Sequence, residues 1–281
     1  MIEKSYAKIN LFLYVLNKRQ DGYHNIYSLM HKIDFYDVIE IKKTDDFGIK
    51  INTNIEDINN NSNLSYRAAE RFFAMAQIKP QVSIDIKKNI PLGAGLGGGS
   101  SNAAYTIKIL NKLFDNPLNS GQLIDIAADI GSDVAFFMHN KAAIATGRGE
   151  KLEEIECTKG NNKVFLAFPG IHISTAYVYS KFLLTKGLAI NKMPFTVAKE
   201  GCSIDTIKNH LHNSLESVVM EEFKVVGRLK TLLNQQFGNA LLCGSGSSVF
   251  SITNLEGVST ELLENTLKSD GVLCRITNLV D

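Results

Sequence analysis

A glycine-rich loop that leads directly into a helix constrains this chain more than any other feature. Residues 91–101 have the sequence PLGAGLGGGSS, and five of the seven residues from Gly93 to Gly99 are glycine. Apolar residues at helical spacing follow as far as Leu113. Glycine lets a large anion approach the backbone closely, and a helix start adds free N–H groups and a positive dipole end. The sequence therefore predicts a phosphate-binding loop, with a flexible linker as the weaker alternative.

Composition and charge exclude several classes of protein. The chain has 281 residues, of which 44% are hydrophobic, and a formal net charge of +1. This length suits one large domain or two ordinary ones, and the near-zero charge gives no general attraction to nucleic acid. The chain contains no apolar run of eighteen residues, and its first residues lack the apolar core of a signal peptide. We expect a cytoplasmic protein with neither a membrane nor a nucleic-acid partner.

The four cysteines, Cys157, Cys202, Cys243 and Cys274, are each more than thirty residues from the next. This spacing forms no metal-binding motif, and disulfides are not expected without a secretion signal. We predict four buried, reduced thiols.

The pattern of apolar residues predicts helices and strands in both halves of the chain. Strands are expected at residues 38–42, 48–51, 82–87, 164–168, 239–243, 249–253 and 272–277. Helices are expected at 64–75, 103–113, 120–131 (capped by Ser120), 215–237 and 256–268. The charged stretch 148–162 has no clear period and is interpreted as a domain crossover. The predicted fold class is α+β, with helices packed on a mostly antiparallel sheet in each of two domains, residues 1–150 and 151–281.

Other phosphate-binding motifs fit the loop less well. Gly93, Gly95 and Gly98 match the dinucleotide fingerprint GxGxxG, but that fold needs a buried parallel strand before the loop. Residues 82–87 alternate between apolar and polar, which is typical of a half-exposed antiparallel strand. The Walker pattern fails because no lysine follows the last glycine, and the DFG at 46–48 precedes the loop and predicts only a turn. A dinucleotide-dependent dehydrogenase stays a weaker alternative.

Residues 91–101 closely resemble the second motif of the GHMP small-molecule kinases, and Gly244–Ser248 (GSGSS) resembles their third motif. Three further stretches, AKINL at 7–11, DGYH at 21–24 and GSDV at 131–134, resemble the 4-diphosphocytidyl-2-C-methyl-D-erythritol kinases within that superfamily. The resemblance implies a two-domain fold with the active site in the cleft between the domains. One departure is Ala135, which stands where that family usually has proline and leaves the local backbone less rigid.

Two residues are candidates for the chemistry. Lys8 lies in an apolar segment, and strand alternation places Asn10 on the same side; a lysine that extends to water is the alternative. Asp133 follows a glycine–serine pair, and a helix cap is the alternative. The resemblance implies that Lys8 is the catalytic lysine and that Asp133 is the general base.

The resemblance also implies contacts with nucleotide and substrate. The predicted ATP-binding residues are Asn63, Leu64, Lys88, Pro91, Leu92, Gly93, Ala94, Gly95, Leu96, Gly97, Gly98, Gly99, Ser100 and Ser101. The predicted substrate-binding residues are Asn10, Tyr23, His24, Thr175 and Tyr179, with Tyr23 and His24 on the cytosine. From the residues alone, Asn63 is a natural helix cap, Lys88 is more often a solvated lysine than a ligand contact, and Tyr23 is more often a partly packed turn residue.

The expected reaction, as the resemblance implies it, transfers a phosphoryl group from ATP to the 2-hydroxyl of a cytidine-diphosphate-linked methylerythritol. Mg²⁺ is expected with ATP, and Ser100 or Ser101 is a candidate contact. No acidic cluster marks a metal site in the sequence, so protein ligands stay unassigned. The alternatives are another GHMP kinase of mevalonate or homoserine type, or a non-catalytic nucleotide-binding protein.

Overall fold

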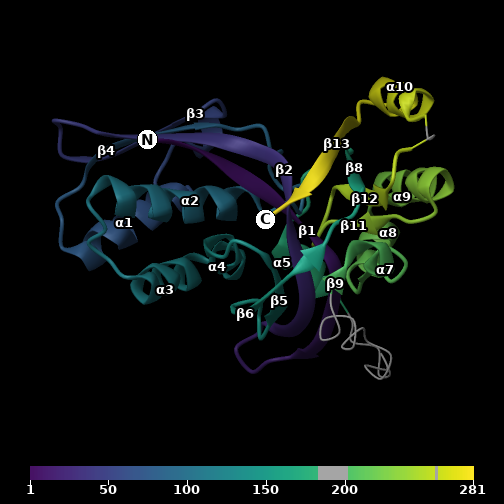
Figure 1. Cartoon of the computed structure of the whole chain (residues 1–281), viewed down its shortest axis with the longest axis horizontal. Coiled ribbons are helices and arrows are strands. Elements are labelled where there is room, and N and C mark those ends of the chain that lie inside the picture. The colour runs from purple at the N-terminus through teal and green to yellow at the C-terminus, as the bar shows by residue number, and fades with distance from the viewer. Residues whose placement is uncertain (183–201, 257–258) are drawn as a thin grey trace. The chain divides into compact units, whose positions relative to one another are not determined.

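The computed structural model describes residues 1–182, 202–256 and 259–281 (Figure 1). Its contacts divide the chain into two compact units. The first unit contains residues 1–7, 35–91 and 97–140, and the second contains residues 8–34, 92–96 and 141–281. These units interleave along the chain, whereas the predicted domains 1–150 and 151–281 divide it only once.

Two long strands contribute to both units. β1 (Ile2–Lys18) and β2 (His24–Lys43) are each cut by a unit boundary. Seven consecutive residues of β1 are buried, from Ala7 to Leu13, as expected for a strand covered on both faces. Of β2, the sequence pattern predicted only residues 38–42.

The first unit packs helices against a small sheet. The second half of β2 pairs antiparallel with β4 (Gln81–Lys87), and β3 (Gly48–Thr53) pairs parallel with β4. The alternation predicted for β4 is confirmed, because Val82, Ile84 and Ile86 are buried. The α-helices are α1 (Leu64–Ala76), α2 (Gly98–Leu113), α3 (Ser120–Ile130) and α4 (Ser132–Met138), and a 3₁₀ turn, η1, spans Glu56–Ile58. α2 packs against both α1 and α4.

The second unit contains a mostly antiparallel sheet. Its strands β13 (Leu273–Val280), β8 (Lys163–Phe168), β12 (Val249–Thr253) and β11 (Leu241–Leu242) are neighbours in that order. The first half of β2 pairs with β13 and with β5 (Ala142–Thr146), which in turn pairs with β6 (Lys151–Ile155). The remaining elements are β7 (Cys157–Thr158), α5 (Thr175–Lys181), β9 (Cys202–Ser203), α7 (Ile204–Ile207), β10 (His212–Asn213), α8 (Glu216–Glu222), α9 (Lys224–Phe237) and α10 (Glu261–Ser269).

The α+β fold class is confirmed, but two local predictions are wrong. The helix expected at 215–237 is two helices, α8 and α9, separated at Phe223. The cap of α3 is Asn119 and not Ser120: Asn119 Oδ1 accepts from the Gln122 N–H, and the Gln122 side chain accepts from the Asn119 N–H. The stretch 148–162 contains β6 and β7, because tertiary pairing forms these strands without a strong local pattern.

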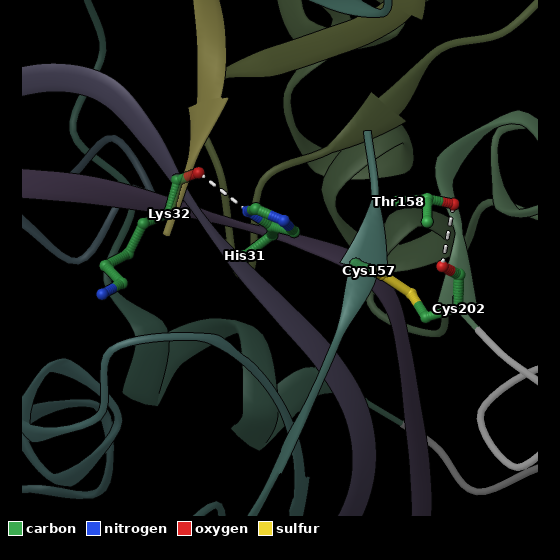
Figure 2. The surroundings of a disulfide bond; sticks show 5 residues. All are labelled: His31, Lys32, Cys157, Thr158 and Cys202. Atoms are coloured by element: carbon green, nitrogen blue, oxygen red, sulfur yellow. Dashed lines mark hydrogen bonds between the residues drawn. A yellow bond between two sulfur atoms is a disulfide. The ribbon is translucent and has the colours of Figure 1, made fainter. Parts of the chain in front are cut away.

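The prediction of four free thiols is wrong for two cysteines. Cys157 and Cys202 form a disulfide that joins β7 to β9, whose parallel pairing places these residues opposite each other with Cα atoms 4.4 Å apart (Figure 2). Cys243 and Cys274 are free, and Cys243 is buried. The two cysteines are 45 residues apart in sequence, and only the pairing of β7 with β9 brings them together. The spacing of the cysteines in the sequence therefore did not indicate this disulfide. Among the described residues, no helix is both long and apolar enough to cross a membrane.

Candidate active site

The glycine-rich loop has the backbone that its composition predicts. Gly95 and Gly97 have φ angles of +76° and +70°, in the left-handed region that favours glycine. Gly97 caps α2, so the helix begins at Gly98 immediately after the loop. The predicted order of loop and helix is therefore confirmed, and the first turn of α2 presents N–H groups that have no partner within the helix.

In the second unit, residues 92–96 of the loop pack on the turn between β11 and β12. The N–H of Ser248 donates to the carbonyl of Ala94 at 3.1 Å. A Cβ on Gly95 would lie 1.9 Å from the carbonyl oxygen of Cys243, so only glycine fits there. The turn is Gly244–Ser248, which the sequence predicted to lie between two strands. The two glycine-rich motifs, far apart in sequence, are thus neighbours in space.

Lys8 and Asn10 lie side by side on β1, as strand alternation predicts. The Lys8 ammonium donates to Asn10 Oδ1 at 2.7 Å, and the Lys8 N–H donates to the carbonyl of Leu96 at 2.9 Å. Lys8 is 4% exposed, so its side chain does not extend to water. A Cβ on Gly244 would lie 3.4 Å from Lys8 Nζ, which places this cation against the third motif.

The predicted substrate residues of the second unit occupy a turn, a strand end and a helix. His24 begins β2 and is buried, and its ring centroid lies 5.4 Å from that of Tyr179 on α5. Burial lowers the pKa of His24, so its imidazole is neutral at neutral pH. Thr175, at the start of α5, shares a hydrogen bond of 2.7 Å with the hydroxyl of Ser245 in the third motif.

Tyr23 lies in the turn between β1 and β2 and is 57% exposed. Its N–H donates to Asp21 Oδ1 at 3.1 Å, and its carbonyl accepts from the N–H of Arg19 at 2.7 Å. The guanidinium of Arg148, which sequence analysis overlooked, lies 5.5 Å from the ring centroid and covers one face.

In the first unit, Asp133 lies in the first turn of α4 and is half-buried. The N-cap of this helix is Gly131. The alternative interpretation of Asp133 as a helix cap is therefore wrong. A carboxylate in the first helical turn is favoured by the positive end of the helix dipole.

Asn63 and Leu64 open α1. The Asn63 side chain accepts from the N–H of Ser65 at 2.9 Å, so the helix-cap interpretation is confirmed. A Cβ on Gly99 would lie 3.6 Å from Leu64 Cδ1, which places Leu64 beside the start of α2. Their contact with adenine stays a prediction.

Lys88 belongs to a buried polar cluster that sequence analysis missed. Its ammonium forms an ion pair with Asp37 Oδ2 and donates to Asn102 Oδ1 at 2.9 Å. Asp37, fully buried in β2, also accepts from the side-chain amide of Asn102 and from the N–H groups of Asn89 and Ile90, at 2.7–2.9 Å. Lys88 is 7% exposed, so the solvated-lysine interpretation is wrong. Burial lowers the pKa of Lys88, and Asp37 opposes that shift.

This Asp37 cluster joins the end of β4 to the first turns of α2, on either side of the loop. A signal was present in the sequence: Asp37 is flanked on both sides by aromatic and aliphatic residues, Phe35 and Tyr36 before it and Val38 and Ile39 after it. A carboxylate in such a position needs partners, because burial of an unpaired charge is costly.

The two serines proposed for Mg²⁺ differ in their surroundings. Ser101 is fully buried, and its hydroxyl lies 2.7 Å from that of Ser5. Ser100 is half-buried in the first turn of α2, and its hydroxyl is a hard oxygen donor of the type that Mg²⁺ prefers. Within residues 1–182, 202–256 and 259–281, no group of three or more His, Cys, Asp or Glu residues is arranged to hold a metal ion.

Comparison with solved structures identifies the fold. The structure superposes on the Methanococcus jannaschii mevalonate kinase with a TM-score of 0.70 over 100% of this chain and 98% of that chain, at 18% identity. A crystal structure of 4-(cytidine 5'-diphospho)-2C-methyl-D-erythritol kinase superposes with a TM-score of 0.78 over 99% of both chains, at 26% identity. The family model for the GHMP kinases N terminal domain matches residues 63–141. The fold is that of the GHMP kinases.

Sequence comparison with curated relatives is more specific. The chain is 39% identical to the 4-diphosphocytidyl-2-C-methyl-D-erythritol kinase of Caldicellulosiruptor saccharolyticus, over 90% of this chain and 88% of the relative. It is also 39% identical to the enzyme of that name from Alkaliphilus metalliredigens, over 99% of this chain and 94% of the relative. The chain belongs to the 4-diphosphocytidyl-2-C-methyl-D-erythritol kinase family.

Proposed function

We propose that this protein uses ATP to phosphorylate the 2-hydroxyl of 4-(cytidine 5'-diphospho)-2-C-methyl-D-erythritol. The products are the 2-phosphate and ADP, and the reaction belongs to isoprenoid precursor biosynthesis. The observation that carries this proposal is family membership over nearly the full length of the relatives, which spans both glycine-rich motifs and the motifs at 7–11, 21–24 and 131–134.

Phosphoryl transfer requires little covalent chemistry from the protein, so catalysis consists mainly of positioning and charge stabilisation. The backbone N–H groups of residues 93–101 bind the nucleotide phosphates. Lys8 stabilises the negative charge on the transferred group. A cation held at 4% exposure suits this role, because electrostatic stabilisation is stronger where water is excluded.

Asp133 acts as the general base in this proposal. Its carboxylate accepts the proton of the substrate 2-hydroxyl while the hydroxyl oxygen attacks the γ-phosphorus of ATP. The bond from that phosphorus to the bridging oxygen of ADP breaks in the same transfer. The position of this half-buried carboxylate in the first turn of α4 supports this role.

Tyr23, His24 and Tyr179 bind the cytosine. The neutral imidazole of His24 carries one N–H donor and one acceptor, so it can pair with a base edge that also presents both kinds of group. The exposed face of Tyr23 is available for stacking, since Arg148 covers one face only. Asn10 and Thr175 contact the rest of the substrate.

Mg²⁺ accompanies ATP in this proposal, with the hydroxyl of Ser100 as its protein contact. A bound Mg²⁺ would neutralise charge on the phosphates. The cytoplasmic location and the absence of a nucleic-acid partner stay predictions.

An ADP-release assay with a panel of acceptors tests the proposal. We expect turnover with the cytidine-diphosphate-linked methylerythritol and at most background with mevalonate, homoserine or free methylerythritol. In parallel, ATP and CDP should each raise the melting temperature, and NAD should not. Turnover of mevalonate or homoserine at a comparable rate would instead assign the chain to another GHMP kinase activity.

A further inference from the structure

Ser28 of β2 forms a hydrogen-bonded chain that ends at Lys8. Ser28 is fully buried, and its hydroxyl donates to the backbone carbonyl of Phe12 at 2.7 Å. The side-chain amide of Asn10 donates to Ser28 Oγ at 2.8 Å, and Asn10 Oδ1 accepts from the Lys8 ammonium at 2.7 Å. All four residues belong to the second unit.

The direction of each hydrogen bond follows from the chemistry of its groups. A serine hydroxyl has a single proton, and here that proton is directed at the carbonyl of Phe12. The Ser28 oxygen is therefore left as an acceptor, so the end of Asn10 that faces it must be the NH₂ group. The carbonyl oxygen of the amide then faces Lys8, whose ammonium is a donor only. In the opposite orientation the NH₂ group would face the ammonium, and two donors cannot form a hydrogen bond with each other.

The third glycine-rich motif limits the space around this chain. A Cβ on Gly244 would lie 3.4 Å from Lys8 Nζ and 3.6 Å from Asn10 Oδ1. The carbonyl of Gly244 is held by the side-chain amide of Asn213 at 2.7 Å. The contact between Lys8 and Asn10 is thus packed against the backbone of Gly244, and the amide oxygen is one of the groups that position the ammonium.

We propose that Ser28 is a positioning residue for Lys8. It acts through Asn10: Ser28 sets the orientation of the amide, and the amide oxygen holds the ammonium in place for phosphoryl transfer. Asn10 keeps a second N–H group, so this role is compatible with substrate contact by the same side chain. The inference rests on the proposed catalytic role of Lys8.

The first test compares Ser28→Ala with a matched control, Ser251→Ala. Ser251 is also fully buried in the second unit, and its hydroxyl also donates to a backbone carbonyl, that of Asn239. Both variants lose a hydrogen bond to a backbone carbonyl, and Ser28→Ala also loses the bond that it accepts from Asn10, so its melting temperature should fall at least as far as that of Ser251→Ala. We expect kcat to fall about 10- to 100-fold in Ser28→Ala only, with the KM for ATP changed less than about twofold. Equal kcat values in the two variants would overturn the proposal.

The second test asks whether Ser28→Ala lowers kcat through the side-chain amide of Asn10. A carboxylate presents an oxygen in either orientation, so in an Asn10→Asp background the acceptor for Lys8 no longer depends on Ser28. We expect Ser28→Ala to lower kcat less than about threefold in that background, a non-additive double-mutant cycle. An undiminished 10- to 100-fold loss there would show that Ser28 acts by another route.

Lys8→Met separates failure of this inference from failure of the proposed role of Lys8. Loss of turnover in Lys8→Met together with normal turnover in Ser28→Ala would overturn the positioning role alone. Near-normal turnover in Lys8→Met would overturn both.

Discussion

Each unit of the molecule contains a buried lysine beside a glycine-rich motif, and the two lysines have different neighbours. In the first unit, Lys88 forms an ion pair with Asp37, and the same carboxylate holds two backbone N–H groups before the loop. In the second unit, Lys8 donates to the neutral amide of Asn10. A carboxylate positions a cation and adds a compensating charge, whereas an amide positions it and adds no charge of its own. The Asp37 cluster is therefore suited to holding the scaffold, and the amide of Asn10 is suited to positioning the ammonium of Lys8.

The largest expected effect concerns the base that is proposed to work with Lys8. Asp133→Asn preserves shape and removes the proton acceptor, so kcat should fall on the order of 10²–10⁴. ATP affinity, measured by calorimetry, should change little. Near-normal turnover in a folded Asp133→Asn protein would place the base elsewhere.

Lys88→Met should act on stability. It leaves the fully buried carboxylate of Asp37 without its cation, and breaking a buried ion pair costs about 3–5 kcal/mol of unfolding free energy. The cost should lie toward the lower end, because the N–H donors of Asn89, Ile90 and Asn102 remain. Urea unfolding measures the effect, and the double variant Asp37→Asn, Lys88→Met should recover part of it. A raised KM for ATP with unchanged stability would show that Lys88 contacts ATP. It would contradict the assignment of Lys88 to the scaffold and of Lys8 alone to the chemistry.

The same substitution at Lys8 should act on turnover. Lys8→Met keeps much of the buried side chain and removes its charge, so kcat should fall about 10²–10³-fold, the range for removal of one electrostatic stabiliser. The contact with Asn10 that this variant loses is to a neutral amide, and the loss of that contact should cost less unfolding free energy than the loss of the buried ion pair in Lys88→Met. If both variants lost stability equally and retained turnover, the two lysines would be equivalent scaffold residues.

The smallest effect is expected at the exposed ring of Tyr23. If this ring stacks on cytosine, Tyr23→Ala should weaken substrate binding by about 1–3 kcal/mol and leave ATP binding unchanged. Arg148→Ala provides the matched control, because it removes the cation from the other face and keeps the ring. Titration calorimetry with CDP measures both variants. Wild-type affinity in Tyr23→Ala would remove this residue from the cytosine site.

Local patterns predicted much of the fold and part of the site. The order of loop and helix at 91–113, the alternation of β4 and the neighbouring positions of Lys8 and Asn10 each depend on residues close in sequence, and each is confirmed. The division of residues 215–237 into α8 and α9 and the cap at Asn119 were missed. Helix capping and helix propensity contribute only a few tenths to about one kcal/mol at each position. Tertiary packing readily outweighs these contributions, so local patterns do not fix such details.

By itself, the sequence determined the glycine-rich loop that leads into a helix, the α+β class and the resemblance to a kinase family, because glycine content, period and motif spacing are local properties of the chain. Only the tertiary structure decided which distant residues meet. Asp37 and Lys88 are 51 residues apart, Asn10 and Ser28 are 18 apart, and Cys157 and Cys202 are 45 apart. Strand pairing and helix packing bring these side chains together, and no local preference of either partner encodes the other. A buried polar group must find a partner, but the fold alone selects which one.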